Sequence, residues 1–203
     1  MKKFFIVSMI LVLVPISLFA ARRFEGYESG NYKISIRIPF ELPVGYFAEK
    51  GFGDNNSTHW AGWGDIGYKN NLEYALEIEY EHFMNDFLSL GGRLGYHFAY
   101  MRSDKIVSRV PFIFNVGFYP FHTSNLEIPI MLGVGGSYLN ARGYSMATMF
   151  LSVETGLSWY WSDNWGIGIR TGVHMIPEFK AGSNADSSMT FFVPITAQIT
   201  FRR

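Results

Sequence analysis

The sequence predicts an all-β protein, an eight-stranded antiparallel up-and-down transmembrane β-barrel, and three observations carry this prediction. Apolar and polar residues alternate along eight segments, most of them ten residues or longer. Short turn sequences and longer connections mostly alternate between these segments, as they do in an up-and-down barrel. The charged residues of the segments share one face, whereas the other face is apolar and rich in aromatic residues.

The composition excludes several classes of protein. The chain has 203 residues, of which 17% are charged and 18% aromatic, with 21 glycines and no cysteine. A soluble domain averages about 25% charged residues, so part of this surface is not expected to face water. The absence of cysteine excludes disulfide scaffolds, thiolate zinc sites and cysteine nucleophiles. Basic and acidic residues balance at 17 each, which gives no field that would attract nucleic acid.

Residues 1–20 have the layout of a secretory signal peptide. Two lysines precede an apolar run over residues 4–19, and Ala20 is a small residue suited to cleavage. A retained membrane helix is disfavoured, because a span needs about 20 apolar residues and this shorter run contains Pro15. We therefore expect export, removal of the signal peptide, and a single barrel domain over residues 21–203.

Alternation with a period of two residues predicts each strand separately. In residues 32–40 every even position is large and apolar, whereas the odd positions are Lys, Ser, Arg and Pro. In residues 72–84 the glutamates fall on the face opposite Leu76 and Ile78, a separation that an extended strand produces and a helix does not. The predicted strands are residues 32–40, 72–84, 88–100, 109–118, 126–135, 149–161, 165–175 and 190–201.

The connections predict two different ends of the barrel. Short turns follow the second, fourth and sixth strands, for example at Asn85-Asp86. Longer connections are expected at residues 41–70, 139–145 and 177–187. The long first loop, 41–70, is rich in glycine and aromatic residues and is expected to extend as a hairpin above the sheet. Because loops on a rigid scaffold often carry binding function, its candidate binding residues are Tyr46, Trp60 and Trp63.

The direction of the apolar face decides between two kinds of barrel. A soluble lipocalin-like barrel turns its apolar face inward, whereas a transmembrane barrel turns it toward lipid. Strand length, aromatic residues near strand ends, and a polar face that mixes both charge signs with small residues all favour the membrane barrel. Inside a narrow lumen such charges would neutralise one another. The predicted lumenal ion-pair network consists of Lys33, Arg37, Glu73, Glu77, Glu79, Glu81, Arg93, Arg109, Glu127, Glu154 and Arg170.

The alternating strands, the signal peptide and the hairpin Tyr160-Trp161-Ser162-Asp163-Asn164-Trp165 together resemble small outer-membrane β-barrel proteins of the OmpA, OmpX and OmpW types. The resemblance covers most of residues 31–203. It implies a place in the outer membrane of a diderm bacterium, with outer-membrane lipid and the barrel-insertion machinery as partners. In these families the last residue is usually aromatic, whereas here Phe201 is followed by Arg202 and Arg203.

The sequence does not point to an enzyme, a metal or a cofactor. His97 and His174 are expected to line the lumen as hydrogen-bonding groups, because they lack a close third metal ligand. His122, Ser124 and Glu127 are the groups of an activated serine. They lie, however, in a connection that we assign to the periplasmic side, away from substrates in the outer leaflet. The glutamates of the second strand are explained more simply by ion pairs than by paired-carboxylate catalysis.

These observations favour a monomeric, non-enzymatic barrel that serves surface interaction or envelope structure through its extracellular loops, with an extracellular partner that the sequence does not identify. One alternative is a narrow channel for small or hydrophobic solutes, as in OmpW-like barrels. A second alternative is a soluble periplasmic lipocalin-like carrier. An eight-stranded barrel is filled by its own side chains, which argues against a wide pore.

Overall fold

The computed structural model describes residues 26–48, 58–59, 68–101, 106–141, 144–178 and 188–203. These residues form strands and turns, and no helix among them has the length and hydropathy needed to cross a membrane. The strands are β1 (Tyr32–Ala48), β2 (Thr58–His59), β3 (Tyr68–Phe83), β4 (Leu88–Met101), β5 (Ile106–His122), β6 (Leu126–Ala141), β7 (Tyr144–Tyr160), β8 (Trp165–Glu178) and β9 (Ser188–Arg202).

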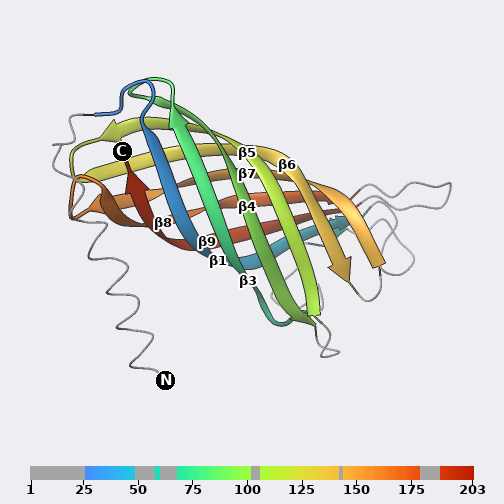
Figure 1. The fold of residues 1–203 in the computed structure, drawn as a ribbon. Coiled ribbons are helices and arrows are strands. Elements are labelled where there is room, and N and C mark those ends of the chain that lie inside the picture. Colours follow the sequence, from blue (N-terminus) through green and yellow to red (C-terminus); the bar gives the residue numbers. More distant parts are fainter. Residues whose placement is uncertain (1–25, 49–57, 60–67, 102–105, 142–143, 179–187) are drawn as a thin grey trace.

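Eight long strands form a closed antiparallel barrel (Figure 1). From β3 onward each strand pairs with the next in the sequence, and β1 pairs with both β3 and β9. The β1–β9 register runs from Lys33 opposite Arg202 to Ala48 opposite Ser188, so the seam closes over most of the strand length. Closure removes the exposed sheet edges that would otherwise recruit another chain. The predicted up-and-down barrel is confirmed.

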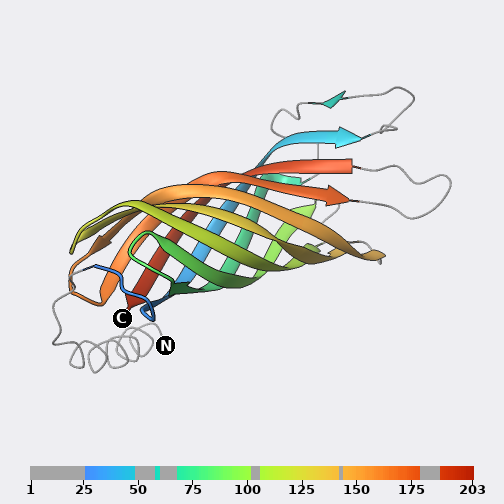
Figure 2. The same cartoon turned by 90° about the horizontal axis from the view of Figure 1, so that it is seen from above.

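The two ends of the barrel differ. At one end, which we call the turn end, lie the short connections 84–87, 123–125 and 161–164 together with the C-terminus (Figures 1 and 2). At the other end, the loop end, β1 reaches Ala48 and β9 begins at Ser188. The connections from β1 to β3 and from β8 to β9 at this end are longer than the turns, as expected. The longer connection expected at residues 139–145 is wrong, because β6 continues to Ala141 and β7 begins at Tyr144.

The apolar face of the sheet points outward. Ile78, Phe114 and Ile169 are each 59–61% exposed, whereas the alternate residues Glu79 and Arg170 are fully buried inside. This is the reverse of a water-soluble barrel, and it matches a wall that faces lipid while its polar face fills the lumen. The orientation excludes the lipocalin-like carrier, whose apolar face would line the interior.

The strands are longer than the sequence predicts, because several turn-forming residues are accommodated inside strands. β1 continues through residues 41–48, the first part of the expected loop 41–70, by pairing with β9, and the register shifts between Pro43 and Gly45. A similar shift between Phe118 and Phe121 lets β5 continue past Pro120. Such β-bulges absorb residues that would otherwise end a strand. The short β2, paired with β1 at Tyr46 and Phe47, is an addition to the eight predicted strands.

Glycines on the inner face make room for large lumenal side chains. A Cβ atom on Gly95 would lie 2.8 Å from Glu77 Cγ, and one on Gly117 would lie 2.4 Å from Ser89 Oγ. Neither approach is tolerable, so the interior has no space for a side chain at these positions. Mid-strand glycine, which otherwise weakens a sheet, is here required by the packing of the lumen.

Replacing Gly95 by valine is expected to destabilise the barrel by about 1–3 kcal/mol, because the new side chain overpacks the lumen. The matched control is Gly136→Val on the outer surface, where an added Cβ would meet nothing closer than Thr148 O at 3.6 Å. Urea unfolding of both variants in lipid vesicles, followed by tryptophan fluorescence, measures the difference. Equal unfolding midpoints for the two variants would contradict a crowded interior.

Candidate functional site

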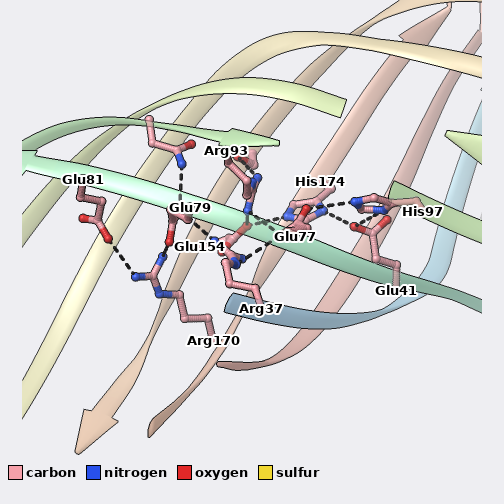
Figure 3. A network of polar contacts seen from close by, with 12 residues as sticks. Arg37, Glu41, Glu77, Glu79, Glu81, Arg93, His97, Glu154, Arg170 and His174 are labelled. Carbon is pink, nitrogen blue, oxygen red and sulfur yellow. Dashed lines mark hydrogen bonds and ion pairs between the residues drawn. The ribbon is translucent and has the colours of Figure 1, made fainter. Parts of the chain in front are cut away.

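The barrel interior holds a continuous network of charged side chains (Figure 3). The structure places every residue of the predicted ion-pair network in the lumen, with exposed fractions of 0–3%. A buried charge without a partner is costly, so the arrangement of partners decides whether such an interior is stable.

In the middle of the lumen, Glu79 links its own strand, β3, to three other strands. Its carboxylate accepts hydrogen bonds from Arg37 Nη1 at 2.9 Å, from Arg170 Nη1 at 2.8 Å and from Asn115 Nδ2 at 2.8 Å. These partners come from β1, β8 and β5, on different sides of the barrel. One carboxylate therefore ties together parts of the chain that are far apart in the sequence.

Glu154 of β7 forms a second junction closer to the loop end. It accepts hydrogen bonds from Arg37 Nη2 at 2.6 Å and from Arg93, and it lies 2.7 Å from His174 Nε2. Arg37 also lies 3.2 Å from Glu77 through its Nε atom. Each guanidinium thus spans two or more carboxylates, which is the geometry that its planar fork of donors favours.

At the loop end of the network, Glu41 of β1 lies directly opposite Glu73 of β3. Two like charges opposite each other destabilise a sheet unless a cation lies between them. Arg109 supplies it, with Nη2 at 2.6 Å from a carboxylate oxygen of each glutamate. His97 Nδ1 lies 3.1 Å from Glu73 Oε1, and His174 Nδ1 lies 2.7 Å from Glu41 Oε1.

Glu41, Glu73 and His97 could in principle hold a metal ion, since their ligand atoms lie within 4.8 Å of one another. Arg109 already contacts both carboxylates at hydrogen-bond distance. A divalent cation bound there would have to displace this guanidinium or suffer its repulsion. The expectation that His97 lacks close further ligands is therefore wrong, since Glu41 and Glu73 lie near it, but the cation that contacts both carboxylates is Arg109.

At the turn end, Glu127 collects a mixed set of partners. Lys33 Nζ lies 3.6 Å from it, Arg202 Nη1 lies 2.8 Å from it, and the Tyr160 hydroxyl donates to it at 3.0 Å. Lys33 also pairs with Glu81 at 3.1 Å. The network therefore extends from the loop end of the lumen to the mouth at the turn end.

An apolar layer lies beside the charged network toward the loop end. Ile113, Phe150, Ile176 and Phe192 point inward and are at most 4% exposed. The Arg109 guanidinium lies over the rings of Phe150 and Phe192, 5.2 Å from each centroid. Such contacts let a buried cation pack against aromatic faces. The apolar layer therefore lies beside the Arg109 end of the ion-pair network.

Several residues of the network escape prediction from the sequence. Glu41 lies within the segment expected to be a loop, and Arg202 appears in the sequence only as a departure from a terminal aromatic residue. Both nevertheless continue the two-residue alternation, Glu41 after Arg37 and Arg202 after Gln198. Extending the alternation past proline and up to the end of the chain would have placed them in the lumen.

The structure does not bring together the groups of an activated serine. Ser124 Oγ donates to Asn125 Oδ1 at 2.7 Å, and His122 Nε2 lies 2.9 Å from Asp86. Glu127 is buried against its own cationic and phenolic partners. These three residues therefore serve separate structural contacts.

The three predicted loop-binding residues are only partly covered by the structure. Trp60 and Trp63 lie outside the described residues. Of Tyr46 the structure gives the backbone, which pairs with His59 of β2 and with Thr190 of β9. Their role in binding stays a prediction.

Replacing Glu77 by alanine is expected to destabilise the barrel by about 3–5 kcal/mol, because it removes a buried anion that faces Arg37 and His97. The matched control is Glu28→Ala, a glutamate exposed at the turn end. Urea unfolding in lipid vesicles compares the two variants. A Glu77 variant with the stability of the control would mean that this carboxylate is not held by ion pairs.

Comparisons with known proteins agree with this architecture. One protein-family model matches residues 18–202, nearly the whole chain. The curated proteins include no sequence that matches. Among solved structures, the Neisserial surface protein A (NspA) is similar at a TM-score of 0.53 and 11% identity, over 85% of this chain and 98% of that chain.

Two further barrels are similar at lower scores. Ail, the attachment invasion locus protein of Yersinia pestis, has 12% identity and a TM-score of 0.41, over 85% of this chain and 99% of that chain. The N-terminal β-barrel domain of Pseudomonas aeruginosa OprF has 11% identity and a TM-score of 0.43, over 84% and 97%.

At such identities the likeness concerns the fold, and NspA carries it. The closed sheet of eight long strands, the apolar exterior and the charged interior are the properties of a barrel that spans a membrane. The chain has the fold of an eight-stranded transmembrane β-barrel, which it shares with NspA.

Proposed function

We propose that this barrel acts in surface interaction or envelope structure through its loop end, as a monomer and without enzymatic activity. The observation that carries the proposal is the filled lumen. Arg37, Glu79 and Arg170 are inaccessible to water, although a water-filled pore would expose the residues that line it. A scaffold whose interior is closed by its own side chains offers its ends for contact with other molecules.

The loop end supports this proposal by its shape and sequence. β1, β8 and β9 project together at that end (Figure 2), and β1 stays paired with β9 out to Ala48. The segment that follows β1 carries Trp60 and Trp63. Aromatic residues of this kind are enriched where proteins bind partners. NspA, which shares the fold, is described as a surface protein.

The test uses two sets of cells of a laboratory strain. One set displays the full chain, and the other displays a variant in which a short Gly-Ser linker replaces residues 49–67. Retention of the cells on mucin-, collagen- and fibronectin-coated plates, together with the settling of cell suspensions, reports surface interaction. We expect the linker variant to lose the retention or settling that the full chain confers. Equal behaviour of the two, at equal amounts of folded barrel, would contradict the proposal.

A narrow path for hydrophobic solutes is the second candidate, and the seam between β1 and β3 favours it. Within the described residues, pairing between these strands ends at Glu41 and Glu73. Tyr32 donates its N–H to Arg203 O and accepts from Arg203 N–H, so its backbone polar groups face β9. Because the N–H groups of successive residues point to opposite sides of a strand, the odd-numbered residues of this part of β1 direct theirs toward β3. Pro39 and Pro43 are odd-numbered and lack that donor, which weakens the seam at the loop end.

Closing the seam tests the second candidate. Leu42 and Leu72 occupy the next register position beyond the last pair, so a disulfide between Leu42→Cys and Leu72→Cys would join the two strands there. If solutes pass through the seam, the bridge should lower the uptake of N-phenyl-1-naphthylamine by cells to the level of cells without the barrel, and reduction should restore it. Equal uptake with the disulfide formed and with it reduced would exclude this route.

A measurement of ion conductance distinguishes a channel from a barrel with a closed interior. The purified barrel in a planar bilayer is expected to give no steady single-channel steps, because the buried ion pairs leave no aqueous path. Steady steps in a preparation that shows the heat-dependent gel shift of a folded barrel would favour the channel over surface interaction.

A further inference from the structure

The residues that precede β1 fold back over the mouth of the lumen at the turn end. We call residues 26–31 the N-terminal cap. Its Tyr27 is 2% exposed, and its ring stacks on Phe83 with centroids 3.5 Å apart and an interplanar angle of 3°. It also lies 5.6 Å from the ring of Tyr119. Phe83 and Tyr119 are fully buried, and the cap ring is among the groups that cover them.

Polar contacts join the cap to the ion-pair network. The Tyr27 hydroxyl donates to Glu127, the same carboxylate that accepts from Tyr160 and Arg202. The Tyr27 N–H donates to Asp86 Oδ1 at 2.9 Å, which fixes the backbone against the β3–β4 turn. Burial, together with the charge of Glu127, raises the pKa of Tyr27 well above its ordinary value, so the phenol remains a donor.

The backbone of the N-terminal cap forms a tight turn, in which the Asn31 N–H donates to Glu28 O. Gly26 has a φ of 132° and Gly30 a φ of 98°, conformations that favour glycine. They flank the segment that carries Tyr27, and a Cβ on Gly26 would lie 3.0 Å from Asp86 Oδ1. The Gly30 N–H donates to Phe83 O at 3.1 Å, and the Glu28 N–H donates to Asn31 Oδ1 at 2.6 Å.

We propose that the N-terminal cap is a stopper that closes the turn-end mouth of the lumen and can open without unfolding of the barrel. Its anchors lie at the turn end, and residues 26–31 precede the first strand of the sheet. Withdrawal of Tyr27 therefore breaks contacts with Phe83, Asp86 and Glu127 and leaves every strand pairing in place. Local opening of this kind needs less free energy than global unfolding.

The natural chain contains no cysteine, so a single introduced thiol reports access to the mouth. Ser89 lies behind the cap, fully buried, with its Oγ donating to Glu81 at 2.8 Å. Ser89→Cys in the folded barrel is treated with a charged methanethiosulfonate reagent. Adding Tyr27→Gly should speed the labelling about tenfold or more, because the ring that covers the mouth is lost.

Two further variants serve as controls for the loss of the Tyr27 ring. Tyr27→Phe retains the ring and should label slowly, whereas Ser29→Gly alters an exposed cap residue and should label like the parent. The heat-dependent gel shift confirms that each variant is folded. Equal labelling rates with and without the Tyr27 ring would overturn the stopper. So would rapid labelling of the parent Ser89→Cys protein, since the mouth would then be open with the cap present.

Discussion

The pairing of buried charge is the constraint on which the rest of this barrel depends. Ionised groups in an interior that excludes water are stable only when opposite charges and hydrogen bonds surround them. Here each of the eight long strands contributes at least one such group, and the partners lie across the lumen as well as on neighbouring strands. One charged residue from each strand, in order from β1 to β9 without the short β2, is Arg37, Glu79, Arg93, Arg109, Glu127, Glu154, Arg170 and Arg202.

This constraint explains where function can lie. Because the lumen is occupied by ion pairs and, toward the loop end, by an apolar layer around Phe150, the interior serves as a rigid support. The outer wall carries apolar side chains that suit contact with lipid. The two ends remain: the loop end, for which we propose contact with other molecules, and the turn end, where Tyr27 and Arg202 both contact Glu127.

The sequence predicts the fold well because a strand has a simple period. Alternation placed Glu77 and Glu79 on one face and Ile78 on the other, and the mixture of charge signs indicated that the polar face is the interior. The glycine and aromatic content of residues 41–70 suggested a loop, whereas β1 continues as a strand to Ala48 with a register shift between Pro43 and Gly45. The place of Tyr27 depends on contacts with Phe83 and Glu127, distant in the sequence, and no local pattern encodes it.

A double-mutant cycle on Arg170 and Glu79 measures the pairing of buried charge directly, since both side chains are fully buried and their Nη1 and Oε2 atoms lie 2.8 Å apart. Arg170→Met and Glu79→Met are made singly and together, and the free energy of unfolding is measured in lipid vesicles. If the charges stabilise each other, each single variant is strongly destabilised and the double variant loses less than the sum of the two. Strictly additive losses would show that these groups do not interact and would contradict an interior held together by ion pairs.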